Sequence, residues 1–323
     1  MLIEKKSLLI LVKPFMVLFS PITFIASLWL LLIKKLGTGK VSYNIFMKLG
    51  VFPILDNYYE PLVNPHKHLT NFSWKERPLL GIDLNIKEQL MILEKFNYQE
   101  ELLDFPIDKK DISQYYYNNG LYEAGDSEYL YCFIRQMKPK RIIEIGSGNS
   151  TLMVRNAIRK NILDFENYSC EHICIEPYEM PWLKDIGVEL IRKKVENIDL
   201  DFFQKLEEND ILFIDSSHII RPQGDVLYEF LEILPSLKKG VYIHIHDIFT
   251  PRDYPNHWLM DEHLLWNEQY LLEAFLSNNS DFKIIGSLNY LRNNFTDIFM
   301  RKFPISALND KIQPGAFWLK RVS

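Results

Sequence analysis

Short apolar runs alternate, from Arg141 onward, with segments whose apolar residues recur every three or four positions. This alternation is typical of a largely parallel sheet covered by helices on both faces. The sequence therefore predicts an α/β domain with seven mostly parallel strands. The predicted strands lie at 141–145, 173–175, 188–191, 211–214, 241–245, 282–285 and 316–320.

A helix is predicted just ahead of the first strand, because Leu130, Phe133, Ile134 and Met137 recur at helical spacing. Gly125-Asp126 supplies a plausible N-terminal cap for that helix. The preceding run of aromatic and amide residues either lines a substrate pocket or forms an aromatic lid that packs on the core. This run consists of Tyr115, Tyr116, Tyr117, Asn118 and Asn119.

The N-terminal part contains an uncharged apolar run at 15–33, which is about as long as a helix that crosses a membrane. A cleaved signal peptide and a buried core helix are the alternatives, although the run lacks an A-x-A-like cleavage site. Ser20-Pro21 can break the helix and give a re-entrant hairpin in place of a single span. In this respect the segment resembles the Ser-Pro anchors of bacterial monotopic phosphoglycosyl transferases.

Lysines flank the apolar run on both sides, with a slight excess on its C-terminal side. By the positive-inside rule, this excess predicts a membrane-associated protein whose remaining chain is cytoplasmic. The predicted organisation is a membrane anchor at 1–36, an irregular connector with a short helix (86–96) at 37–112, and a catalytic domain at 113–323. The flanking lysines are Lys5, Lys6 and Lys13 before the run, and Lys34, Lys35, Lys40 and Lys48 after it.

The net charge of −5 over 323 residues provides no basic surface for a phosphate backbone, so nucleic acid is not an expected partner. The three cysteines, Cys132, Cys170 and Cys174, are odd in number and lie in segments predicted to be buried. They fit a reducing compartment better than a disulfide framework. Composition does not predict the oligomeric state.

A glycine loop follows the first predicted strand and leads directly into a helix, in the order Glu144-Ile145-Gly146-Ser147-Gly148-Asn149-Ser150. Glycines at such a turn let the backbone approach a ligand closely. A second acid, Glu176, ends the next strand, where a carboxylate can accept both hydroxyls of a ribose. A nicotinamide dinucleotide site is less consistent with this loop, because Thr151 stands where G-x-G-x-x-G requires its third glycine.

These motifs resemble those of class I S-adenosylmethionine-dependent methyltransferases, and the longer motifs resemble a bacterial, membrane-anchored branch of that superfamily. The resemblance implies a Rossmann-like fold and S-adenosylmethionine as cofactor. Glu144 would contact the methionine amine directly or through water, Glu176 the ribose and Glu196 the adenine edge. The remaining residues of the expected cofactor set are Gly146, Ser147, Gly148, Asn149, Ser150 and Asp215. The long motifs are 115–120, 195–197, 211–218, 234–249 and 266–275.

Candidates for the reacting end follow the fourth and fifth strands, because ligands bind outside the carboxyl ends of parallel strands. Asp215 and His218 follow the fourth strand, and His246 and Asp247 follow the fifth. Asp215 and His218 can also be explained without a catalytic role, because Asp215 can cap a turn and His218 can be solvated. His244 faces one side of its strand and is better explained as a core histidine.

Asp215, His246 and Asp247 can remove a proton from an acceptor, or they can together hold Mg²⁺ or Mn²⁺. The presence of base groups favours methylation of an oxygen, and the apolar N-terminal run suggests a lipid-linked or glycan-type acceptor. A non-catalytic adenosyl-binding scaffold and a nucleotide-sugar enzyme remain alternative functions.

Overall fold

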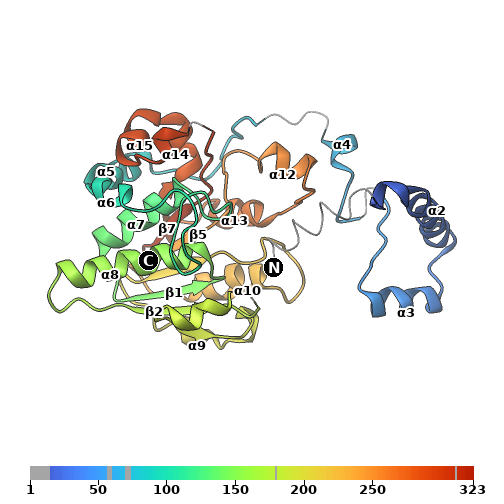
Figure 1. The fold of residues 1–323 in the computed structure, drawn as a ribbon, viewed down its shortest axis with the longest axis horizontal. Helices are drawn as coiled ribbons and strands as arrows, with labels where there is room; N and C mark the ends of the chain where they lie inside the picture. The colour runs from blue at the N-terminus through green and yellow to red at the C-terminus, as the bar shows by residue number, and fades with distance from the viewer. Residues whose placement is uncertain (1–14, 57–59, 70–73, 179, 310) are drawn as a thin grey trace. The chain divides into compact units, whose positions relative to one another are not determined.

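The structure is a computed structural model that describes residues 15–56, 60–69, 74–178, 180–309 and 311–323. The chain divides into two compact units, Met1–Phe72 and Ser73–Ser323. The predicted connector at 37–112 is thus shared between the units. Figure 1 shows the elements of each unit with their labels.

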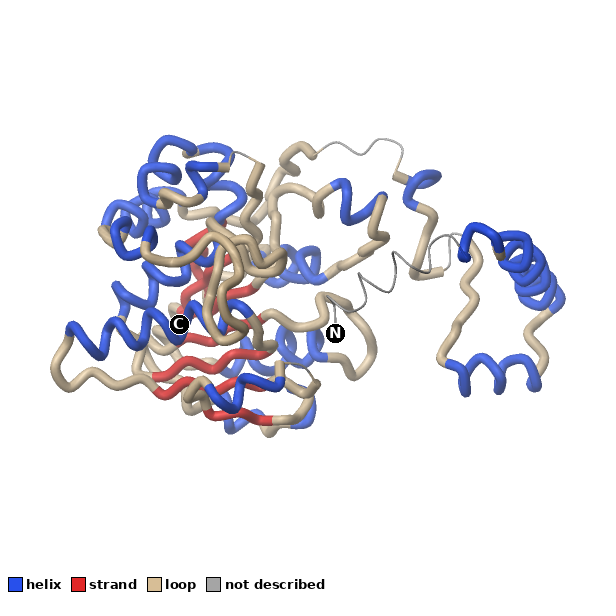
Figure 2. The backbone as a smooth tube through the Cα atoms, in the orientation of Figure 1, coloured by secondary structure: helices blue, strands red, loops and turns tan. Residues whose placement is uncertain are grey.

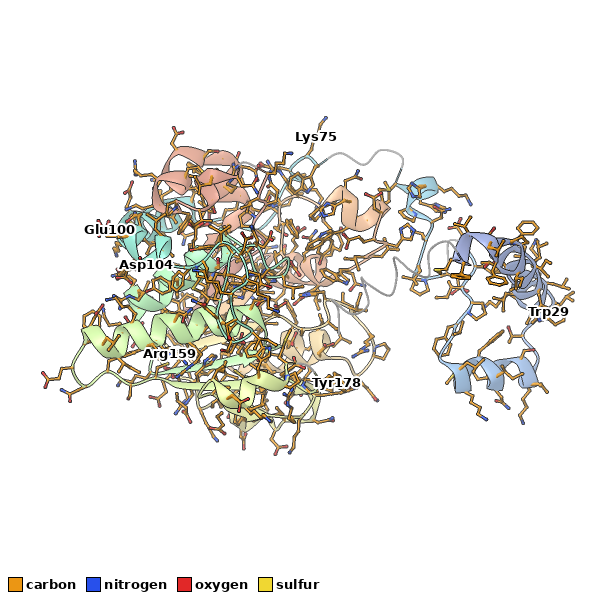
Figure 3. The ribbon with its side chains drawn as sticks, viewed as in Figure 1. Trp29, Lys75, Glu100, Asp104, Arg159 and Tyr178 are labelled. Carbon is orange, nitrogen blue, oxygen red and sulfur yellow. The ribbon has the colours of Figure 1, made fainter. Side chains whose placement is uncertain are left out.

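In the first unit, three helices are described: α2 (Ser20–Leu36), α3 (Lys40–Leu49) and α4 (Pro65–His68). A separate helical turn precedes Phe19, and α2 starts anew with Pro21 in its first turn, where a missing N–H costs no hydrogen bond. The interruption expected at Ser20-Pro21 is therefore present. No residue of α2 is buried; Trp29, labelled in Figure 3, is 60% exposed.

The predicted membrane span is not found. Among the described residues, no helix is both long enough and apolar enough to cross a membrane. The 17 residues of α2 extend about 26 Å, whereas the hydrocarbon core is about 30 Å thick. The break before Ser20 is the physical reason, because it divides the apolar run. Lys5, Lys6 and Lys13 lie outside the described residues.

In the second unit, the described strands form one seven-stranded sheet with the order β3-β2-β1-β4-β5-β7-β6. All neighbours pair in parallel except β7, which is antiparallel to both β5 and β6. Figure 2 shows the strands in red. The predicted mostly parallel, Rossmann-like sheet is confirmed. Its strands are β1 (Arg141–Ile145), β2 (Glu171–Ile175), β3 (Glu189–Ile191), β4 (Ile211–Ile214), β5 (Tyr242–Ile245), β6 (Phe282–Ser287) and β7 (Phe317–Arg321).

The sheet separates two apolar clusters, as the alternation along β1 illustrates. Ile142 packs in the cluster that includes side chains of α7 (Asp126–Met137) and α8 (Asn149–Asp164), whereas Ile143 and Ile145 pack in the other. Successive side chains of a strand point to opposite faces, so both faces are covered. The remaining elements are α5 (Ile86–Lys95), α6 (Gln99–Leu103), α9 (Leu200–Phe203), α10 (Asp225–Tyr228), α11 (Leu234–Ser236), α12 (Asn256–Met260), α13 (Glu268–Leu276), α14 (Leu288–Asn294), α15 (Thr296–Lys302) and the short turns η1 (Pro181–Asp185), η2 (Val195–Asn197), η3 (Glu229–Ile233) and η4 (Ser306–Leu308).

The tyrosines before α7 belong to the core. Tyr115 and Tyr117 are buried; their hydroxyls donate to the carbonyls of Tyr122 and Leu102, at 2.9 Å each. Buried hydroxyls with carbonyl partners are fully accounted for by packing. The lid interpretation of this run thus fits the structure, whereas neither tyrosine lines the large pocket described below.

Candidate active site

The residues that follow β1, β4 and β5 lie side by side, because backbone hydrogen bonds between neighbouring strands continue one residue past the end of each strand. Gly146 N donates to Ile175 O (3.0 Å), Asp215 N to Ile145 O (2.9 Å) and His246 N to Ile214 O (2.9 Å). These bonds hold the glycine loop and the two candidate reacting segments at one edge of the sheet. The edge is where open α/β sheets bind their ligands.

A cavity of about 370 Å³ lies beside the glycine loop. Four residues of the expected cofactor set line it: Gly146, Glu176, Glu196 and Asp215. The Glu176 carboxylate accepts hydrogen bonds from the backbone N–H groups of Ser147 (3.4 Å) and Tyr178 (2.8 Å). Tyr178 marks this loop in Figure 3. The arrangement places a fixed carboxylate where a ribose can bind.

Gly146 is the position where the loop tolerates no side chain. Its φ is +76°, and a Cβ atom there would lie 1.8 Å from the carbonyl oxygen of Asp215. Gly148 differs, because its φ is −169° and the nearest atom to a Cβ would be Met180 Cε at 3.8 Å. Only Gly146 is therefore required by the protein's own backbone.

Glu144 is placed beneath the loop and not in the cavity. It is fully buried and accepts hydrogen bonds from Ser150 Oγ (2.6 Å) and Thr151 Oγ1 (3.0 Å), with His172 Nε2 3.0 Å from its other oxygen. Glu144 fixes the start of α8 through these hydrogen bonds. It does not line the cavity, and its expected contact with the methionine amine, directly or through water, stays a prediction. Ser147, Gly148, Asn149 and Ser150 do not line the cavity either.

A second, larger cavity of about 890 Å³ opens on the other side of the strand ends. His246 and Asp247 line it, together with Asp126 at the start of α7. Three tryptophans, Trp74, Trp258 and Trp266, also line it. We call it the acceptor pocket, and the smaller cavity the cofactor pocket.

The two pockets meet at a cluster of charged side chains. His246 Nδ1 lies 3.5 Å from Asp215 Oδ1 and 3.6 Å from Asp247 Oδ1, while its Nε2 lies 3.5 Å from Asp126 Oδ2. Tyr122 lies against the same imidazole, with ring centroids 4.8 Å apart. Because Asp215 lines the cofactor pocket and His246 the acceptor pocket, one ion pair separates them.

The charges of this cluster follow from its burial and its acids. Burial lowers the pKa of His246, but Asp247 and Asp215 outweigh it and hold that pKa well above its ordinary value. Burial raises the pKa of Asp215, but His246 and His218 outweigh it and hold that pKa well below its ordinary value. Burial raises the pKa of the Asp247 carboxyl. His246 is therefore an imidazolium paired with ionised Asp215 at neutral pH.

His218 is held by an acid that the sequence did not single out. Its Nδ1 lies 2.8 Å from Oε2 of Glu268, which is fully buried, and its Nε2 lies 3.3 Å from Asp215 and 3.4 Å from Asp247. His218 is thus buried and paired, in contrast to the solvated alternative. The charge pattern fits an orienting role: Glu268 fixes the ring, and the ring links the two aspartates.

The loop after β4 is secured at three consecutive residues by three carboxylates. Ser216 Oγ donates to Glu229 Oε2 (3.1 Å), and Ser217 Oγ donates to Asp225 Oδ1 (2.7 Å). Glu268 holds His218, as described above. His218 and Asp247 both have positive φ, +60° and +56°. Such backbone is unfavourable for side chains other than glycine, and these contacts offset its cost.

His244 lies in the core, as its alternation along the strand indicates. It is fully buried, its ring stacks on Phe213 with centroids 4.0 Å apart, and Nε2 lies 3.2 Å from the Tyr122 hydroxyl. Burial holds its pKa well below the ordinary value. A neutral, packed imidazole of this kind supports the fold and does not face either pocket.

Two groups of side chains have the spacing of metal ligands among the described residues. Asp215, His246 and Asp247 form one, with ligand atoms within 4.8 Å of one another; Glu144, His172 and Cys174 form the other. The second group is buried and carries the hydrogen bonds that fix α8. The first group lies at the pocket edge, and its two carboxylates and one imidazole fit Mg²⁺ or Mn²⁺. Cys132, Cys170 and Cys174 are free thiols.

Parts of the chain are similar to known proteins. Residues 143–248 match the protein family described as "Methyltransferase domain". An uncharacterized protein of Archaeoglobus fulgidus is 38% identical over 143 residues, which are 42% of this chain and 63% of that protein. The chain thus spans less than two thirds of that relative. A solved O-methyltransferase from Bacillus cereus, in complex with SAH, is 13% identical with a TM-score of 0.34 and covers 72% of this chain and 91% of its own.

The matched residues begin within β1 and contain the glycine loop, β4 and β5, and so include both sides of the shared edge. Residues 143–248 are therefore similar to a methyltransferase domain.

Proposed function

We propose that the protein transfers the methyl group of S-adenosylmethionine to a hydroxyl oxygen of an acceptor bound in the larger pocket. The observation that carries this proposal is the shared edge: Asp215 lines the cofactor pocket, His246 and Asp247 line the acceptor pocket, and 3.5 Å separates Asp215 from His246. Positioning two reactants across such an edge is the main requirement of an in-line methyl transfer.

Removal of the hydroxyl proton requires a base beside the acceptor. The Asp247 carboxylate and the His246 imidazole are the candidate bases. Glu268 holds His218, and His218 in turn holds Asp247 and Asp215 in position. General-base help of this kind contributes roughly 10²- to 10⁴-fold to a rate. The same proposal is consistent with a divalent cation held by Asp215, His246 and Asp247, which would supply charge to lower the pKa of the bound hydroxyl.

The cofactor assignment predicts a loss of binding when the Glu176 carboxylate is removed. Glu176→Gln should weaken binding of S-adenosylhomocysteine (SAH) by roughly 10- to 100-fold, because charge-assisted hydrogen bonds to the ribose are lost. Isothermal titration calorimetry measures this. Glu189→Gln, an exposed acid at the start of β3, is the matched control. Equal SAH affinity in the two variants would remove Glu176 from the site.

We further propose that the first unit binds a lipid surface without spanning it, which would bring the enzyme to a membrane-associated or glycan-type acceptor. The support is that Phe24, Ile25 and Trp29 of α2 are 60% exposed or more and that Lys34 and Lys35 lie in its last turn. Apolar helices with basic residues at their ends favour anionic membrane interfaces.

Deletion of residues 1–35 should therefore abolish sedimentation with anionic vesicles while SAH affinity stays within about twofold. A vesicle pelleting assay in high salt, run beside calorimetry, measures both. Full pelleting of the shortened chain would place any membrane contact elsewhere. Loss of SAH binding would instead show that the first unit supports the second.

A further inference from the structure

We infer that the acceptor pocket binds a neutral saccharide whose pyranose rings lie against its tryptophans, with one ring hydroxyl at the His246 and Asp247 edge. This inference rests on the proposed function and narrows its acceptor to one chemical class. The lining of the pocket supports this inference, because it combines tryptophan rings, hydrogen-bonding side chains and more acidic than basic residues.

The tryptophans come from three separate segments and are fixed by their surroundings. Trp74 Nε1 donates to the carbonyl of Asp253 at 2.7 Å, and the Arg252 guanidinium lies 5.2 Å from its ring centroid. Trp258 and Trp266 contact each other edge to face at 5.2 Å. All three are only partly buried, so ring surface remains available in the pocket. Such rings provide rigid apolar platforms with a polar edge.

The rest of the lining combines apolar side chains, such as Leu121 and Leu264, with polar ones. Amide side chains of Asn256, Asn309 and Gln313 line the same pocket, as does the Glu262 carboxylate. Asn256, Asn309 and Glu262 are exposed. Their side chains can exchange hydrogen bonds with ring hydroxyls, which a purely aromatic acceptor lacks. The alternating apolar and hydroxyl-bearing surfaces of a sugar ring satisfy both kinds of lining.

The charge balance excludes a strongly anionic acceptor. Four acids line the pocket, Glu123, Asp126, Asp247 and Glu262, against one lysine, Lys311. The His246 ring nitrogens already lie 3.5 Å from a carboxylate oxygen of Asp126 and of Asp215. A diphosphate or polyuronate would meet net repulsion here, since like charges brought together disfavour binding. The volume of about 890 Å³ also exceeds what a single ring requires.

The chemical step then balances without a further reactant. The saccharide oxygen forms a bond to the methyl carbon as the carbon–sulfur bond breaks, and the sulfur keeps that electron pair. The hydroxyl proton passes to the base at the shared edge. The products are a methyl ether, SAH and one proton.

The test uses the full chain saturated with SAH on an array of neutral, uronic-acid and phosphorylated glycans. We expect retention on neutral glycans, and Trp258→Ala should lower the apparent affinity at least roughly tenfold. Trp258→Phe, which keeps a ring, should retain most of the binding. Trp29→Ala, which alters an exposed tryptophan of the first unit, is the matched control and should bind like the unaltered chain.

Retention on anionic glycans alone, no retention on any neutral glycan, or unchanged binding by Trp258→Ala would each overturn the inference. SAH calorimetry on the same samples distinguishes failure of the saccharide inference from failure of the proposed function. Normal SAH affinity without glycan retention rejects the saccharide alone, whereas absent SAH binding rejects the proposed function. Normal SAH affinity of Trp258→Ala also shows that this variant is folded.

Discussion

Gly146→Ala should abolish cofactor binding, lowering SAH affinity by at least roughly 100-fold, or about 3 kcal/mol. The added Cβ would lie 1.8 Å from the Asp215 carbonyl oxygen, and φ at this position is +76°. The loop therefore has to move away from β4, and the cofactor pocket loses its wall. Calorimetry with SAH and a thermal melt measure the two consequences.

Gly148→Ala is the matched control for this prediction. Its backbone is extended, and the nearest atom to the new Cβ is a methionine methyl at 3.8 Å. The variant should fold with little loss of melting temperature. Any loss of SAH affinity in this variant would then mean that the new methyl group occupies space that the cofactor needs. Equal stability and equal SAH affinity in the two variants would refute the assignment of Gly146 as the obligatory turn.

Asp215→Asn, His246→Ala and Asp247→Asn should each lower kcat by roughly 10²- to 10⁴-fold while SAH affinity changes much less. Each removes a charge from the edge that both pockets share. Labelled methyl transfer into acceptor-containing extracts measures the rate. Asp297→Asn, an exposed acid on α15, is the control that should retain activity. Undiminished turnover in all three edge variants would move the chemistry elsewhere.

Chelator treatment and a pH profile distinguish the two roles considered for Asp215, His246 and Asp247, which are metal binding and direct proton removal. Inhibition that Mg²⁺ or Mn²⁺ reverses would mean that the residues are metal ligands. Chelator-insensitive turnover would mean direct proton removal. In that case, activity should rise with pH through a limb above about 6.5, the ordinary histidine value. The reason is that the pKa of His246 is raised, and a protonated imidazole has to lose its proton before it can accept one.

The sheet could be predicted because its strands are buried on both faces and so appear as continuous apolar runs. The predicted 211–214 strand is β4 without any shift, and 282–285 falls short of β6 by two residues. The N-terminal unit could not be predicted in the same way. Hydropathy alone reports an apolar run at 15–33, whereas the helix ends are set by Pro21 and the backbone turn at Phe19.

The candidate site was predictable where it follows directly from strand ends. Gly146, Glu176, Glu196 and Asp215 line one cavity, and His246 with Asp247 lines the other. Glu144 could not be placed from the sequence, because its position two residues before a glycine does not reveal that Ser150 and Thr151 take up its oxygens.

Glu268 and the tryptophans were missed for a different reason. Glu268 lies 50 residues from His218 along the chain, and their contact depends on the path of the loop that precedes α13. Trp74 reaches the same pocket from the start of the second unit. The stretch beginning at Trp266 was recognised as a motif, but only the folded chain shows that Glu268 holds His218.

The ion pair between Asp215 and His246 links the two pockets, so their occupancies are expected to be interdependent. S-adenosylmethionine carries a positive sulfonium, whereas SAH is uncharged at sulfur, and Asp215 borders the cofactor pocket while pairing with His246. In the proposed function, the cationic cofactor would compete with His246 for the same carboxylate, and the spent cofactor would not. Acceptor affinity should therefore differ between the loaded and spent enzyme, and by reciprocity the acceptor should change the preference between the two cofactor forms by the same factor.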